Sequence, residues 1–211
     1  PSHSAQAAKF LAEESNDRES PTFTKQDPST WSEDTTPVVS KLYTKLAGIE
    51  TEQFKGSDKF LRTQVKPAKG ETGSTAYGPV QITKGLMSGY VGNKSDIEFS
   101  ADEKDYIDRF MKQGEAFAAY GNGDWESIPE GSTVEVLGVE YTRDEVKNTF
   151  EYGKAGVLTS PTDQKLYDSV VKKIMADVLN GVGGDVAKFA QVWRFGNVNT
   201  SQVAYEGRLT E

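Results

Sequence analysis

The chain has 211 residues, with 24 lysine and arginine residues against 32 aspartate and glutamate residues, no cysteine and a single histidine, His3. The lack of cysteine excludes disulfides, a thiol nucleophile and a cysteine-ligated zinc site, and His3 cannot supply a Ser-His-Asp triad or a multi-histidine metal site in the folded body. The net charge of −8 argues against nucleic acid or an anionic membrane as partner. No stretch approaches the ~18 apolar residues of a membrane span. We therefore expect no metal and no cofactor, and acid–base chemistry must come from carboxylates.

Residues 1–36 are predicted to form a tail or linker rather than a domain, because they hold few large apolar residues. A short helix is expected near Ser4–Glu14, followed by a polar stretch rich in serine, threonine and proline. No charged segment is followed by an apolar one, so we expect no signal peptide.

The first strong helix is predicted to begin at Thr36-Pro37, a capping residue followed by proline at the first helical position. Its apolar face ends in a carboxylate: Val39, Leu42, Tyr43, Leu46 and Glu50. We expect the helix to end near Glu50, and residues 51–78 to form an extended loop or a small hairpin.

The rest of the chain is predicted to be helical with one minor β element. Expected in chain order are a helix over Ser100–Tyr120 with a capping box from Ser100 and Glu103, a hairpin within 132–141, a short helix capped by Thr142 and Glu145, a helix marked by Leu166 through Val178, and a last helix opened by Asp185. The fold class is therefore mainly α (α+β).

Glu50 is the first candidate for chemistry. A carboxylate in line with Leu42 and Leu46 faces the interior, and burial would raise its pKa toward the range of a general acid. Periodicity alone, however, favours an ordinary helix-end carboxylate that turns to solvent.

The second candidate is the glycine-rich segment 73–83. Glycines let the backbone approach a ligand closely, Gln81 offers a donor and an acceptor, and Tyr77 offers a flat face for a sugar ring. Taken alone, the same residues are typical of an ordinary glycine-rich turn.

Together these two segments resemble the goose-type lysozyme and soluble lytic transglycosylase superfamily. Its members carry a helix ending in I-E-S or V-E-S, then a Ser-x-x-G-A-x-G-L-M-Q-type segment. The counterparts here are Ile49-Glu50-Thr51, with threonine for serine, and Ser74 to Thr83, which keeps the Gly78-x-x-Gln81 core. A third, A-Y-N-A-G-like motif and its following Tyr-x-x-Arg correspond to 190–197 and 205–209, where Trp193 and Phe195 replace the usual tyrosine and alanine.

The resemblance implies a lysozyme-like helical domain over 37–211, with insertions at 52–72 and 95–151. The 95–151 insertion holds 15 acidic and 5 basic residues and would be a lid, a specificity lobe, a docking surface or simply a solvated acidic subdomain.

The implied substrate is the peptidoglycan glycan strand, cleaved at the β-1,4 bond between MurNAc and GlcNAc with Glu50 as the catalytic acid. The resemblance implies that Ser74 and Gln81 contact the sugar backbone, that Tyr77 and Tyr205 flank the scissile bond, and that Trp193 lines the groove; on its own, Tyr205 also reads as a core aromatic. Lytic transglycosylases usually lack a second carboxylate, and no motif marks Asp58 or Glu71 as one. The pattern therefore favours a lytic transglycosylase that leaves 1,6-anhydro-MurNAc ends.

Three alternatives stay open. One is a hydrolytic muramidase, and another is a non-enzymatic phage virion protein with a decayed lysozyme-like fold. The third is a glycan-binding module that uses Tyr77, Trp125 and Trp193 as stacking platforms. With no signal peptide expected, the resemblance favours a bacteriophage protein that acts on the bacterial cell wall, either within the virion beside other virion proteins or as a lysin released from the host cytoplasm.

Overall fold

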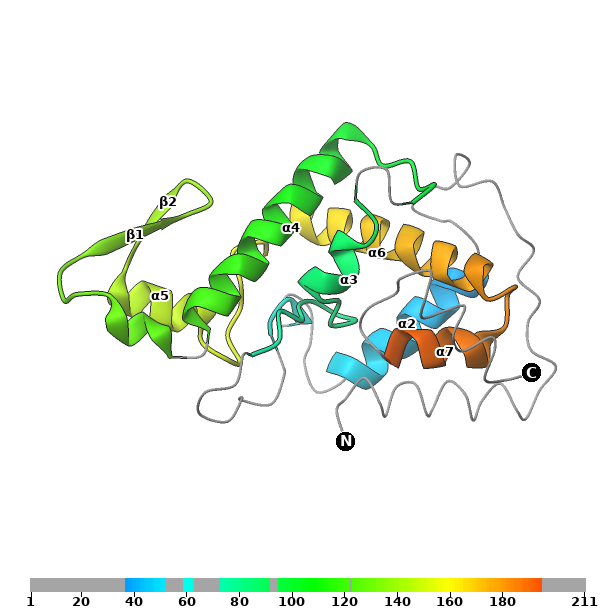
Figure 1. Ribbon diagram of the computed structural model, residues 1–211, viewed down its shortest axis with the longest axis horizontal. Coiled ribbons are helices and arrows are strands. Elements are labelled where there is room, and N and C mark those ends of the chain that lie inside the picture. Colours follow the sequence, from blue (N-terminus) through cyan, green and yellow to red (C-terminus); the bar gives the residue numbers. More distant parts are fainter. Residues whose placement is uncertain (1–36, 52–58, 63–72, 92–94, 122, 195–211) are drawn as a thin grey trace.

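A computed structural model describes residues 37–51, 59–62, 73–91, 95–121 and 123–194 (Figure 1). The elements in chain order are α2 (Pro37–Thr51), α3 (Lys84–Ser88), α4 (Ala101–Tyr120), the 3-10 helix η4 (Asp124–Ser127), β1 (Thr133–Val136), β2 (Val139–Thr142), α5 (Arg143–Phe150), α6 (Pro161–Gly181) and α7 (Val186–Arg194). The two strands pair antiparallel, with Thr133 opposite Thr142 and Val136 opposite Val139. The predicted mainly α fold with one small hairpin is confirmed.

Local capping chemistry sets where the helices begin. The Ser100 hydroxyl accepts a hydrogen bond from the Glu103 N–H while the Glu103 carboxylate accepts one from the Ser100 N–H, and Thr142 and Glu145 repeat this arrangement at α5. Both capping boxes are as predicted. The sequence did not predict α3 or η4, since five and four residues are too short to show a helical period.

The core forms around α6, which contacts α2, α4 and α7 (Figure 1). Seven large aromatic side chains in it are fully buried: Tyr77, Tyr106, Phe110, Phe117, Phe150, Tyr167 and Phe189. No helix in the described part of the chain is both long and apolar enough to cross a membrane.

A buried ion pair joins α4 to α6. The Lys173 Nζ lies 2.6 Å from Glu103 Oε1 and donates to the Glu98 carbonyl at 3.1 Å, while the Ser169 hydroxyl donates to Glu103 Oε2 at 2.6 Å. Burial acts to raise the pKa of Glu103, but hydrogen bonds from Lys173, Ser169 and the Ser100 N–H outweigh it and lower the pKa. Glu103 therefore has a tertiary role that its cap position did not indicate.

One end of α4 carries a small projection, which we call the hairpin lobe and define as η4, β1, β2 and α5 (Figure 1). Its centre is Phe150, whose ring lies 5.9 Å from that of Phe117 and 5.8 Å from that of Tyr141. The lobe lies within the acidic 95–151 region and is attached to the core through α4.

Residues 59–62 close the base of the lobe. Leu61 forms a β-bridge with Ala155, the Arg62 N–H donates to the Lys154 carbonyl at 3.3 Å, and the Gly153 N–H donates to the Arg62 carbonyl at 3.0 Å. The buried Arg62 guanidinium also donates to the Phe117 carbonyl at 3.4 Å. This described part of the expected loop pairs with the residues after α5 rather than within a hairpin of its own.

Candidate active site

Glu50 lies in the last turn of α2 and faces the interior, as its spacing predicts. Its side chain is 3% exposed, beside a helix face that buries Leu42 and Leu46. Its Oε1 atom is buried without a hydrogen-bond partner among the described residues. Burial raises the pKa of Glu50 from 4.5 to about 7. Near neutral pH this carboxyl can therefore both donate and accept a proton.

Among the described residues, burial is the cause of the raised pKa of Glu50. No charged group in the described ranges contributes to it, so no second carboxylate acts on Glu50 there. Asp58 and Glu71 lie outside the described residues. Within those residues, no group of three or more histidine, cysteine, aspartate or glutamate side chains is placed to hold a metal ion.

Thr51 links Glu50 to the glycine-rich segment. Its buried hydroxyl lies 2.9 Å from the Ala47 carbonyl and 3.1 Å from the Pro79 carbonyl, and it has one proton to donate between them. In the I-E-S pattern that Ile49-Glu50-Thr51 resembles, this position is a serine, and threonine also carries a hydroxyl. The substitution is thus compatible with a contact between the end of α2 and Pro79.

Residues 78–81, the Gly78–Gln81 turn, form a tight reversal closed by backbone hydrogen bonds. The Tyr77 N–H donates to the Ile82 carbonyl and the Gln81 N–H to the Gly78 carbonyl, each at 3.0 Å. Gly78 has a φ of +81°, a conformation that favours glycine, and Gln81 adopts a φ of +53°. The turn therefore has a specific geometry that its residues support.

The Gln81 side chain is buried and hydrogen-bonds to backbone carbonyls within the protein. Its Nε2 donates to the Leu61 and Gly78 carbonyls, both at 2.9 Å, and the residue is 5% exposed. These bonds offset the strain of its left-handed backbone and attach the turn to residues 59–62. In this arrangement the amide donors shape the turn rather than reach toward a sugar.

Tyr77 is a core residue in the structure. It is fully buried, its hydroxyl donates to the Leu158 carbonyl at 3.2 Å, and its ring lies 5.8 Å from that of Phe117. This corrects the expectation of a flat face open to a sugar ring, because both sides of the ring are packed.

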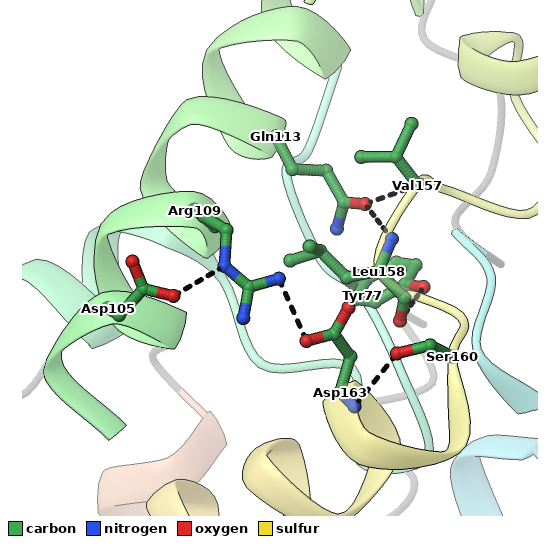
Figure 2. Close-up of polar contacts among 8 residues, drawn as sticks. All are labelled: Tyr77, Asp105, Arg109, Gln113, Val157, Leu158, Ser160 and Asp163. Atoms are coloured by element: carbon green, nitrogen blue, oxygen red, sulfur yellow. Dashed lines mark hydrogen bonds and ion pairs between the residues drawn. The ribbon is translucent and has the colours of Figure 1, made fainter. Parts of the chain in front are cut away.

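A polar network next to Tyr77 fixes residues 157–158, where the Leu158 carbonyl accepts the hydrogen bond from the Tyr77 hydroxyl (Figure 2). The Gln113 Oε1 accepts from the Val157 and Leu158 N–H groups at 2.9 and 3.3 Å. One turn earlier in α4, Arg109 lies 2.8 Å from Asp163 and 2.9 Å from Asp105. The sequence pattern did not predict these links between α4 and the start of α6.

The other predicted binding residues are dispersed. Ser74 is half-buried and its hydroxyl accepts from the Ala76 N–H at 3.2 Å, so it begins the segment that leads into the turn. Trp193 in α7 is 5% exposed and stacks on Phe189 at 5.5 Å, a packing position that gives no platform for a sugar. Tyr205 lies outside the described residues.

Trp125, the remaining candidate platform, is half-buried in the hairpin lobe. Its ring lies under Lys147 at 4.5 Å and Arg143 at 5.5 Å. With Tyr77 and Trp193 in the core, the three aromatic residues do not form a common glycan-binding face. This arrangement disfavours the binding-module alternative.

Tyr167 contacts the site through two hydrogen bonds that the sequence did not predict. From α6 its hydroxyl donates to the Tyr77 carbonyl at 2.8 Å and receives the Val80 N–H at 3.3 Å. In the sequence it is an aromatic residue in a helical stripe, and no local signal distinguishes it from a packing residue.

Comparisons with protein-family models, with curated proteins and with solved structures found no significant match to the chain. The functional argument therefore depends on the residues and geometry of this molecule.

Proposed function

We propose that this protein is a peptidoglycan lytic transglycosylase in which Glu50 is the catalytic acid and base. The observation that supports this most directly is a buried carboxyl at a helix end, with a pKa near 7, whose neighbour Thr51 contacts the Gly78–Gln81 turn. The same two segments carry the sequence resemblance.

In the proposed reaction, protonated Glu50 donates its proton to the oxygen that joins MurNAc C1 to GlcNAc C4. The C1–O bond breaks, GlcNAc leaves with that proton, and C1 acquires oxocarbenium character. The C6 hydroxyl of the same MurNAc then attacks C1, and the Glu50 carboxylate accepts the hydroxyl proton. The product is a 1,6-anhydro ring, no water is consumed, and Glu50 returns to its protonated form.

A pKa near 7 suits both halves of this cycle, because one group must donate a proton and then remove one. Glycosidases that hydrolyse their substrate use two carboxyl groups, about 5–5.5 Å apart when retaining and about 6.5–9.5 Å apart when inverting. The pKa of Glu50 shows no influence of a second carboxylate in the described ranges. A muramidase would need a second carboxylate from outside these ranges, where Asp58 and Glu71 lie. The preference for the transglycosylase comes from the sequence resemblance, because lytic transglycosylases usually lack that carboxylate.

The test is a digest of purified peptidoglycan, with soluble products weighed by mass spectrometry. We expect the wild type to release muropeptides one water lighter than hydrolytic products, and Glu50→Gln to release none while remaining folded. Matched controls are Glu52→Gln, two residues along the chain, and Glu126→Gln at an exposed position in η4. Both should retain activity.

Products with reducing ends would favour the muramidase. An inactive, folded wild type on several peptidoglycan chemotypes would favour the non-enzymatic virion protein. Activity of Glu50→Gln equal to wild type would assign the acid role to another residue.

A further inference from the structure

Two consecutive residues of α6 contact the two halves of the candidate site. The Tyr167 hydroxyl bonds to the Tyr77 carbonyl and the Val80 N–H on either side of the Gly78–Gln81 turn. The next residue, Asp168, accepts a hydrogen bond from the Tyr43 hydroxyl of α2. One rigid turn of helix thus holds both the turn and the helix that carries Glu50.

Tyr167 packs closely against the backbone of the turn. Tyr167 is fully buried, and a Cβ on Gly78 would lie 2.4 Å from its ring carbons. Glycine at this position lets the tyrosine approach the backbone closely enough for its hydroxyl to reach two backbone groups. Tyr167 therefore constrains the position of the turn together with Thr51 and Leu61.

A third contact closes a loop of interactions around Glu50. From α2, Thr51 reaches the turn at Pro79; the turn bonds to Tyr167; and Asp168 returns to Tyr43 of α2. Tyr43 and Thr51 are eight residues apart, or about 12 Å along the helix axis. Because α2 is held at two separate points, its last turn, with Glu50, cannot shift relative to the Gly78–Gln81 turn without breaking one of these bonds.

We propose that Tyr167 is a positioning residue for the reaction of Glu50. It holds the Gly78–Gln81 turn in the position, relative to the Glu50 carboxyl, that the bound substrate requires. The inference rests on the proposed function. Removing the hydroxyl leaves a buried carbonyl and a buried N–H without this partner, and the turn relaxes toward an arrangement that satisfies them. Misplacement of about 1 Å in an active site can cost roughly 100-fold in rate.

The test compares Tyr167→Phe with Tyr106→Phe. Both tyrosines are fully buried, but the Tyr106 hydroxyl has no hydrogen-bond partner among the described residues. Rates per folded molecule are measured on soluble peptidoglycan strands across pH. We expect Tyr167→Phe to lower kcat about 10- to 100-fold with a smaller change in KM, and to shift the limb of the pH profile due to Glu50. Tyr106→Phe should match the wild type.

Exchange of the Val80 amide proton gives a readout that does not depend on activity. It should be faster in Tyr167→Phe and unchanged in Tyr106→Phe. If Tyr167→Phe folds poorly, Thr51→Val and Thr51→Ser interrogate the same loop of contacts. Thr51→Val removes the hydroxyl at nearly constant volume and should lower kcat. Thr51→Ser keeps the hydroxyl and should have a kcat close to that of the wild type.

The outcomes separate the two proposals. If Glu50→Gln is inactive while Tyr167→Phe keeps the wild-type kcat, KM and pH profile, the positioning role is overturned and the proposed function stands. If the wild type yields no products, or Glu50→Gln is fully active, the proposed function is overturned and the positioning role with it.

Discussion

Glu50 should make the stability of this protein depend on pH in a direction opposite to that of most carboxylates. Burial raises its folded-state pKa to about 7 from 4.5. Because the folded state binds the proton more tightly, the stabilising contribution is fully present below about pH 4.5 and is lost as pH rises through about 7. At about 1.4 kcal/mol per pKa unit, the full effect is about 3.5 kcal/mol.

Glu50→Gln stays neutral at every pH, so it isolates this contribution. Relative to wild type, the variant should gain about 2 to 3 kcal/mol in unfolding free energy between about pH 5 and about pH 8.5. Urea titrations followed by tryptophan fluorescence and circular dichroism at several pH values measure the difference. Glu126→Gln, at an exposed position, corrects for the general effect of removing one negative charge.

A difference between Glu50→Gln and wild type that stays flat across this pH range would refute the reasoning. It would mean that the Glu50 carboxyl is solvated and charged in the folded protein, and it would remove the physical basis for its acid role. The measurement requires no substrate, so it tests the site independently of the reaction.

Three further substitutions test other parts of the fold by urea or thermal unfolding. Gly78→Ala should cost roughly 3 kcal/mol or more, since it combines a positive φ with a Cβ only 2.4 Å from the Tyr167 ring; Gly131→Ala, where φ is +79° but no atom lies within 4 Å, should cost clearly less. Lys173→Met should cost about 3–5 kcal/mol by leaving the buried Glu103 carboxylate without its cation, and adding Glu103→Gln should recover much of the loss. Ser160→Ala removes the cap of α6 and should cost about 1 kcal/mol; no loss would show that the cap is replaced by solvent.

Features encoded by neighbouring residues could be predicted from the sequence. The interior position of Glu50 follows from its helical spacing to Leu42 and Leu46, and the starts of α4 and α5 follow from Ser100 and Thr142 with a glutamate three residues later. In each case the signal and its consequence lie within a few residues of each other.

The hydrogen-bond partners of the side chains in the site could not be predicted, because these partners lie far away in the sequence. Gln81 bonds to Leu61 20 positions away, and Tyr77 to Leu158 81 positions away; both contacts turn residues that looked available for a ligand into internal supports. Tyr167 shows the reverse case: its partner Tyr77 is 90 positions away, and only the fold shows that an ordinary helical aromatic residue holds the turn.

The attachment of the hairpin lobe at a single residue affects which sequence changes the fold can accept during evolution. The chain enters the lobe beside Arg62, where a Cβ on Gly121 would meet the guanidinium, and returns at Gly153 and Lys154, which bond to the backbone of the same residue. Because both ends of this excursion meet at one residue, its exposed β1–β2 turn can change in length without altering the spacing of α4 and α6. Residues 123–152 carry eight acidic and two basic side chains, so substitutions at their exposed positions can change the surface charge while Glu50 and the Gly78–Gln81 turn keep their geometry.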